Sequence, residues 1–328
     1  MGNKRILGYV LLSGMILAGL HCAIASDLII ESKTQSYAEN ESKIRFEGDV
    51  DVTIDDLHVV SDTADVSVVN GDKLDTATFY DKPYAYQNKA NKKREVKANI
   101  IKVSLIKKTV KAVGDTQTII FDGKTPIAVV NADEQEYNSK SDVMTAQGNV
   151  TIDYKETKAF SDYAEFITDK DGNIKNILLT GNAIVKDDEN EVSADKITYN
   201  ASNHMFTAIG RTHTKTINSE GNVLNLYSDR QELNQLTNFY NASGNCNVYY
   251  EDYFAHGPKI VIYPDKKTNK PNEIYFVGRS SITQGPRTIF ADKIMIITNP
   301  KNFKAEGNTR TVIKNVGNSG DTNMGLGL

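Results

Sequence analysis

The chain has 328 residues, of which 39% are hydrophobic; with its 22 glycines the apolar share is about 46%, which is typical of a folded globular protein rather than a disordered one. Its 38 basic and 42 acidic residues are mixed along the sequence and leave a net charge of −4. Because a nucleic-acid surface needs a clustered basic face, this distribution argues against nucleic acid as a partner. The one basic cluster, from Lys89 to Arg94, lies in an Asn-rich stretch and is expected to be a solvated turn.

Residues 1–25 have the pattern of a secretory signal. Lys4 and Arg5 are followed by an apolar stretch from Ile6 to Leu20 and by small residues around a cleavage site, Ala23-Ile24-Ala25. This pattern predicts an N-terminal signal helix and export. The alternative is an uncleaved anchor, since about 20 apolar residues can span a bilayer. If the segment is cleaved, Cys246 is the only cysteine left, and no intramolecular disulfide can form.

The rest of the chain is built from a repeat of roughly 33 residues, marked by a glycine that opens a short strand-like run. The successive spacings are 66, 34, 33, 29, 34, 34 and 29 residues, and in the first, double interval Asp81 stands where a glycine is expected. The marker glycines are Gly48, Gly114, Gly148, Gly181, Gly210, Gly244, Gly278 and Gly307.

A second marker, a small residue followed by Asp, recurs in phase with the glycines, as in Ser161-Asp162 and Ala194-Asp195. The runs after both markers alternate apolar and polar residues, which is the period of a strand with one buried face. Polar turn clusters separate the runs, so each repeat is interpreted as two strands joined by a hairpin. About nine repeats then predict roughly eighteen strands.

This pattern predicts an all-β fold over residues 27–315. A glycine inside a strand usually marks a bulge or a bend, so the eight marker glycines are expected at the corner of a sheet that is folded lengthwise. The predicted fold is an elongated antiparallel β-jellyroll, a V-shaped β-taco, with apolar side chains on its inner side. A closed β-solenoid with a filled interior has most of the same features. Residues 316–328 lack the pattern and are expected to be disordered.

The repeated unit resembles the OstA-like repeat of the lipopolysaccharide-transport proteins. Its best copies are AQGNVTIDYKETKAFSDYAEF, at 146–166, and LTGNAIVKDDENEVSADKITY, at 179–199. The resemblance implies a periplasmic β-jellyroll that holds lipid A acyl chains of lipopolysaccharide in its interior. It also implies stacking of such modules through their end strands, with other Lpt-family proteins or head to tail with a second copy. The role would be that of the soluble bridge (LptA-like), of the anchored inner-membrane component (LptC-like), or of a fusion of two modules.

Under this resemblance, apolar residues on the inward side of the alternating runs are the candidates for the lipid groove. They are Val50, Val52, Ile54, Val150, Ile152, Tyr154, Phe166, Val185, Ile197, Tyr199, Val248 and Ile294. The candidate end strands for stacking lie near 27–52 and 303–314.

Neither a catalytic nor a metal site is expected. The chain has five histidines, none with a metal-ligand spacing, and it lacks a G-x-S-x-G elbow. No cofactor is expected either, and the sequence has no Gly-rich GKS/GKT phosphate loop with which to use ATP. The leading hypothesis, which rests on the repeats and on what their resemblance implies, is a passive lipid-binding transport bridge. The alternative is a structural or adhesive exported β-solenoid without lipid cargo. A carbohydrate-active β-helix is disfavoured because acidic residues do not cluster.

Overall fold

The computed structural model describes residues 28–38, 42–54, 56–69, 73–89, 92–169, 173–217, 221–265, 267, 271–298 and 301–314. The signal or anchor segment expected at 1–25 and the tail expected at 316–328 lie outside them. The described residues form 22 β-strands and no helix, so among them there is no helix that is long and apolar enough to cross a membrane. The prediction of an all-β chain is confirmed.

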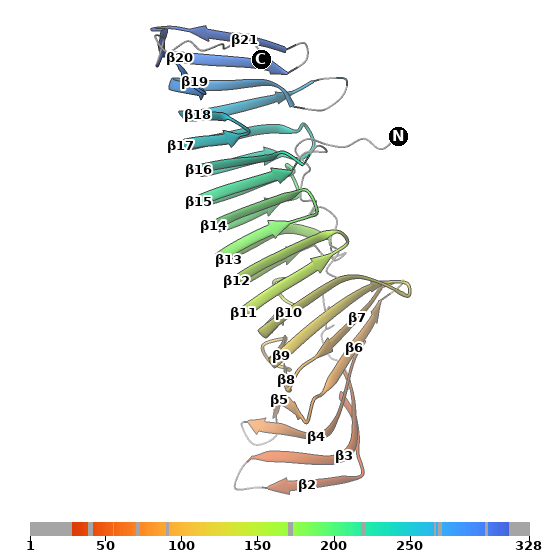
Figure 1. Cartoon of the computed structure of the whole chain (residues 1–328). Helices are drawn as coiled ribbons and strands as arrows, with labels where there is room; N and C mark the ends of the chain where they lie inside the picture. The colour runs from red at the N-terminus through yellow and green to blue at the C-terminus, as the bar shows by residue number, and fades with distance from the viewer. Residues whose placement is uncertain are drawn as a thin grey trace. The chain divides into compact units, whose positions relative to one another are not determined.

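The strands are short at both ends of the described chain and mostly 11 to 14 residues long between them (Figure 1). Their bounds are β1 (Leu28–Glu31), β2 (Thr34–Ala38), β3 (Lys43–Ile54), β4 (Leu57–Val69), β5 (Lys73–Tyr80), β6 (Tyr84–Lys89), β7 (Lys92–Lys97), β8 (Ile100–Ser104), β9 (Thr109–Asp122), β10 (Thr125–Asn138), β11 (Val143–Tyr154), β12 (Thr157–Thr168), β13 (Ile174–Lys186), β14 (Asn190–Asn200), β15 (Met205–Ile217), β16 (Val223–Asn234), β17 (Phe239–Tyr250), β18 (Tyr253–Pro264), β19 (Pro271–Gln284), β20 (Arg287–Thr298), β21 (Lys301–Glu306) and β22 (Arg310–Ile313).

Neighbouring strands pair antiparallel, and most long strands pair with the strands before and after them in sequence. Four strands are interrupted and appear as two shorter ones. Both β1 and β2 pair with β3, β5 and β6 both pair with β4, β7 and β8 both pair with β9, and β21 and β22 both pair with β20. Counting each interrupted pair as one strand gives the eighteen strands that the repeats predict.

The marker glycines lie at β-bulges or at these interruptions. Their φ angles run from +73° to +91°, and at seven of the eight the next residue also has a positive φ, between 45° and 48°. On β11, Gly148 and Asn149 together face the single residue Asp162 of β12, as the register shift between Gln147 and Val150 shows. Asp81, in place of the missing glycine, has a φ of 65° and interrupts the chain between β5 and β6.

The small-residue–Asp marker belongs to the same corner. The Asp133 side chain, on β10, lies over Gly148 of the next strand, so that a Cβ at Gly148 would be 2.8 Å from the Asp133 Cγ. The Asn149 side chain donates to both carboxylate oxygens of Asp133, at 3.0 and 3.2 Å. The same contact recurs between Asp195 and Gly210, between Asp229 and Gly244 and between Asp292 and Gly307.

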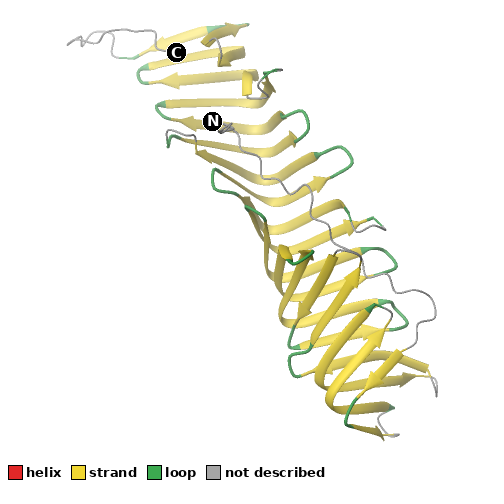
Figure 2. Cartoon of the chain, turned by 90° about the vertical axis from the view of Figure 1, so that its right-hand side faces the viewer, coloured by secondary structure: helices red, strands yellow, loops and turns green. Residues whose placement is uncertain are grey.

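Each strand therefore consists of two halves on either side of a bulge, and Figure 2 shows the strands bending. In the part of the chain up to 181, we call residues 50–54, 57–61, 84–88, 93–97, 116–122, 125–132, 150–154 and 157–161 the post-glycine half. Residues 43–47, 63–69, 73–80, 100–104, 109–113, 134–138, 143–147 and 163–168 are the pre-glycine half. The two halves face each other: the Thr118 hydroxyl, on one, donates to Gln135 Oε1, on the other, at 2.7 Å.

The chain divides after Gly181 into two compact units. The described residues of the N-terminal unit are those from 28 to 181, and those of the C-terminal unit run from 182 to 314. Each unit has its own buried apolar residues. In the C-terminal unit these include Cys246, which is fully buried; burial raises the pKa of its thiol to about 11. The thiol stays protonated at neutral pH and is expected to be unreactive.

We expect Gly148→Ala to destabilise the N-terminal unit by about 2–4 kcal/mol, because a side chain there adopts a left-handed conformation and also collides with Asp133. Urea unfolding followed by circular dichroism measures the loss.

The matched control is Gly123→Ala, in the β9–β10 turn. Gly123 also has a positive φ, of 60°, but nothing lies within 4 Å of its missing Cβ, so we expect only the conformational cost of about 1–2 kcal/mol. Asp133→Gly should recover part of the stability in the Gly148→Ala background. Equal losses in the two single variants, or no recovery, would show that the contact between Asp133 and Gly148 does not shape the corner.

Candidate functional site

The predicted groove residues lie on the inward side of the strands. In the N-terminal unit Val50, Val52 and Ile54 are on β3, Val150, Ile152 and Tyr154 on β11, and Phe166 on β12, each at most 3% exposed. In the C-terminal unit Val185, Ile197, Tyr199 and Ile294 are at most 2% exposed, whereas Val248 is half-buried. Their contact with a lipid stays a prediction.

Cross-strand pairing joins the inward residues of the N-terminal unit into rows. The inner row runs, partner by partner, through Val52, Val59, Ala85, Val96, Thr118, Val130, Ile152 and Ala159. The mouth row lies closer to the strand ends and runs through Ile54, Leu57, Gln87, Arg94, Ile120, Ala128, Tyr154 and Thr157. Both rows belong to the post-glycine half, and the inner row is almost entirely apolar.

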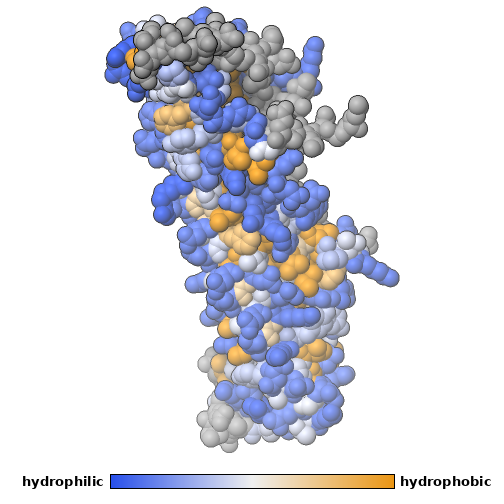
Figure 3. All heavy atoms as spheres, in the orientation of Figure 1, coloured by the Kyte–Doolittle hydropathy of each residue, from blue (hydrophilic) through white to orange (hydrophobic). Residues whose placement is uncertain are grey.

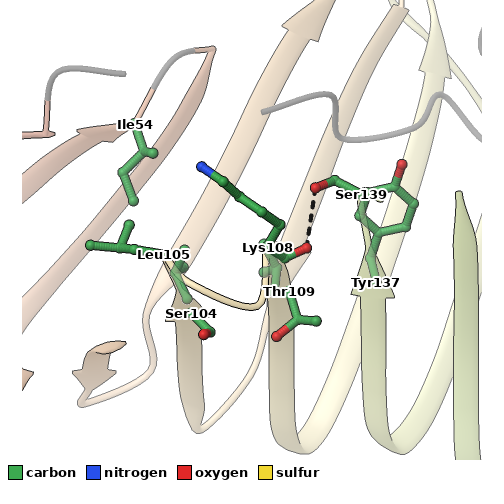
Figure 4. Close-up of a pocket in the computed structure, with 9 residues that line it drawn as sticks. Ile54, Ser104, Leu105, Lys108, Thr109, Tyr137 and Ser139 are labelled. Atoms are coloured by element: carbon green, nitrogen blue, oxygen red, sulfur yellow. Dashed lines mark hydrogen bonds between the residues drawn. The ribbon is translucent and has the colours of Figure 1, made fainter. Parts of the chain in front are cut away.

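The two halves of the N-terminal unit pack against each other through these rows. A cavity at the mouth, between Ile54 of one half and Val103, Val110 and Tyr137 of the other, has a volume of about 10 Å³. Figure 4 shows that the Lys108 side chain extends from the β8–β9 turn toward the side on which Ile54 lies. A space of this size holds at most one water molecule.

The outer surface differs from this interior: the face shown in Figure 3 is mostly hydrophilic, with scattered apolar patches. His213, on β15 of the C-terminal unit, is partly exposed, stacks on Tyr227 at 4.3 Å between ring centroids, and hydrogen-bonds the Asn225 side chain at 2.9 Å. Among the residues that the structure describes, no cluster of His, Cys, Asp and Glu could hold a metal ion.

A buried polar layer interrupts the apolar interior, and the sequence interpretation missed it. Thr118 donates to Gln135 Oε1, and Gln135 Nε2 donates to Thr116 Oγ1 at 2.8 Å and to the Val130 carbonyl at 3.0 Å. All three side chains are at most 4% exposed. Because every member has a partner, this layer can lie in the interior without a large desolvation penalty.

The C-terminal unit has the same layer. Thr212, Thr214 and Gln231 follow Thr116, Thr118 and Gln135 by 96 positions each, and Thr214 again donates to the glutamine Oε1. The signal in the sequence is Gly-x-Thr-x-Thr, present in these two places as GDTQT at 114–118 and GRTHT at 210–214. A third copy, GNTRT at 307–311, has exposed threonines and forms no such layer among the described residues. The polar layer could have been found by looking for polar residues at the inward-facing positions, two and four residues after each glycine.

Gln135→Leu is expected to lower the free energy of unfolding by about 1–3 kcal/mol, because it leaves the Thr118 hydroxyl buried without its acceptor. Gln147→Leu is the matched control: Gln147 is exposed on β11, so its loss should stay within about 0.5 kcal/mol. Denaturant unfolding of the two variants measures the difference. If Gln135→Leu is as stable as the control, the layer is not a structural element of the interior.

Two residues of the basic cluster, Lys93 and Arg94, lie on strand β7 and not in the solvated turn that the sequence suggested. Lys93 is partly exposed and forms an ion pair with Glu95 at 2.5 Å, but Arg94 points the other way and is only 5% exposed. Strand alternation explains the difference, since neighbouring residues point to opposite faces. Burial lowers the pKa of the Arg94 guanidinium to about 10, so it remains charged at neutral pH.

Residues 29–120 match the sequence family described as "LptA/(LptD N-terminal domain) LPS transport protein". Among solved structures, this chain is similar to LptH from Pseudomonas aeruginosa, which is described as the "LptA homologous periplasmic component of the conserved lipopolysaccharide transport device". The sequence identity is 14% and the TM-score is 0.32. The match covers 37% of this chain and 82% of LptH. No curated protein sequence matches. The family match supports, over residues 29–120, the resemblance to the OstA-like lipopolysaccharide-transport proteins that the repeats indicate.

Proposed function

We propose that this chain is a periplasmic bridge protein for lipopolysaccharide transport, whose interior shelters the lipid A acyl chains. The observation that carries the proposal is the inner row, from Val52 to Ala159, whose members from Val52 to Thr118 lie within the family match. Burial of an acyl chain is favourable by about 0.8 kcal/mol of free energy for each CH₂ group removed from water. A lined interior can therefore hold them without any chemistry, while the sugars remain in solvent.

Loading requires the two halves of a unit to separate. Each strand passes from one half to the other through a bulge, where two consecutive residues have left-handed conformations and the ladder of hydrogen bonds is interrupted. Such a line of bulges can serve as a hinge. In this scheme the side chains that pack against each other in the empty protein exchange their mutual contacts for contacts with acyl chains, so that little apolar surface is exposed in either state.

The packed interior also favours a second candidate, a structural or adhesive β-solenoid without cargo. Both candidates share the strand arrangement and the corner, and they differ in whether lipid reaches the inward residues. A photocrosslinking experiment separates them.

A photoreactive residue at Ile152 is expected to capture lipopolysaccharide in the cell envelope, because Ile152 belongs to the inner row. Thr151 is the control on the same strand: it faces outward, where its Oγ1 accepts from Asn131 at 3.1 Å. In the C-terminal unit, Val185 is expected to capture lipid and its neighbour Ile184, which is equally apolar but half-buried, is not. Capture at both faces, or at neither, would favour the solenoid without cargo.

We propose further that the end strands join neighbouring modules. In the pairings of the described residues, β2 pairs with β3 alone and β22 with β20 alone, which leaves an edge that can accept another strand. Both edges carry exposed apolar side chains: Tyr37 on β2 is 58% exposed and Ile313 on β22 is 51% exposed. Other Lpt-family proteins and a second copy of this chain are the candidate partners.

Tyr37→Lys and Ile313→Lys are each expected to reduce self-association, because a lysine on an edge strand opposes pairing with another sheet. Sedimentation velocity over a range of protein concentrations measures the effect. Leu236→Lys is the control, since Leu236 is 71% exposed but lies in the turn between β16 and β17. Association that is unchanged in both edge variants, or equally weakened in the control, would contradict an edge-to-edge joint.

A further inference from the structure

Arg94 occupies an unusual position for a charged side chain. It lies on β7 in the mouth row of the N-terminal unit, between Gln87 of β6 and Ile120 of β9. Both Arg94 and Gln87 are buried, at 5% and 3% exposure. Every other member of this row from Ile54 to Tyr154 is apolar or, in Tyr154, aromatic. The row thus contains one pair of adjacent side chains rich in hydrogen-bond donors.

Three donor atoms of this pair have no hydrogen-bond partner among the residues that the structure describes. They are Arg94 Nε and Nη2 and Gln87 Nε2, and all three are buried. The Arg94 guanidinium lies over the ring of Tyr137, which belongs to the pre-glycine half, at 5.6 Å from the ring centroid. A cation–π contact offsets only part of the penalty of burying a charge, and an unpaired buried cation is strongly unfavourable.

The surroundings point to the chemistry of the missing partner. Burial lowers the pKa of Arg94 and the neighbouring Tyr137 raises it. No carboxylate of the described residues forms an ion pair with Arg94. The carboxylate nearest in sequence, Glu95, is bound to Lys93 on the opposite face of β7. Tyr137 also lines the mouth cavity, together with Lys108. A cation and an amide donor without an acceptor fit an oxyanion.

We propose that Arg94 and Gln87 bind the anionic headgroup, a phosphate or carboxylate, of an amphiphile whose acyl chains lie along the inner row. This inference rests on the proposed function and adds the position of the headgroup. Ile54 ends β3 and Leu57 begins β4, so the row that contains Arg94 lies at the mouth. The inner row lies two residues away along each strand, closer to the bulges. The headgroup is therefore held where the acyl chains enter. A planar guanidinium with two free nitrogens suits an oxyanion with two oxygens.

The test compares two probes with identical acyl chains, dioctanoyl phosphatidic acid and dioctanoylglycerol, by titration calorimetry on the full chain. We expect the wild-type protein to bind the phosphate-bearing lipid at least tenfold more tightly. Arg94→Met should abolish this preference without weakening the binding of dioctanoylglycerol, and Arg94→Lys should retain part of it. Lys93→Met is the matched control: it removes the same charge from the outer face of the same strand and should leave the preference unchanged.

Each other outcome has a distinct meaning. If the wild type binds both lipids equally, the headgroup site is overturned and the acyl-chain interior stands. If it binds neither, the proposed function itself fails. If inorganic phosphate alone binds with the same dependence on Arg94 and displaces no lipid, the ligand is free phosphate and the amphiphile is overturned. Arg94→Met should fold, with a melting temperature equal to or above that of the wild type, because it removes an unpaired buried charge; a lower melting temperature would mean that the protein itself satisfies Arg94.

Discussion

The close contact between an aspartate and the glycine of the next strand is the constraint on which the rest of the structure depends. Asp133 over Gly148 and Asp195 over Gly210 occupy the space of the missing Cβ, and two consecutive left-handed residues place the bulge at the same height on successive strands. Because the bulges align, the strands of a unit bend at a common line, and their inward faces meet. The apolar interior, the polar layer and the position of Arg94 all follow from that line.

We propose that the interior of each unit closes on itself when it is empty and opens to receive another molecule. In the N-terminal unit the residues from Val52 to Ala159 form an apolar row, and the hydrogen bond between Thr118 and Gln135 connects the two halves next to the bulges. Near the bulge this connection favours a fixed geometry, whereas at the mouth the Arg94 and Gln87 donors are left unsatisfied. This difference between the hydrogen-bonded residues near the bulges and the unsatisfied donors at the mouth fits two halves that stay joined at the corner and separate at the mouth.

Much of the fold follows from periodicity alone. The glycine interval and the alternating runs after Gly48 and Gly148 predicted an all-β chain of roughly eighteen strands, because a half-buried strand needs a period of two. The corners were expected at the glycines, because a bulge needs a left-handed residue. The partners of the Asp marker could not be derived, since the contact joins neighbouring strands. Arg94 was assigned to a solvated turn because the prediction relied on the basic, Asn-rich composition around it and not on the alternation of strand residues. Val96, two positions later, lies on the same face of the strand and already indicates that this face points inward. The tight closure of the interior depends on the distance between the halves, which no local pattern encodes.

The central claim is that the two halves separate to admit acyl chains, and a distance measurement between them tests it most directly. Spin labels on cysteines replacing Lys124, in the β9–β10 turn, and Lys140, in the β10–β11 turn, report on the two sides of the mouth of the N-terminal unit, and the buried thiol of Cys246 need not be replaced. Pulsed electron paramagnetic resonance should show a longer distance in the presence of lipopolysaccharide than in its absence. An unchanged distance at saturating lipid would contradict the account.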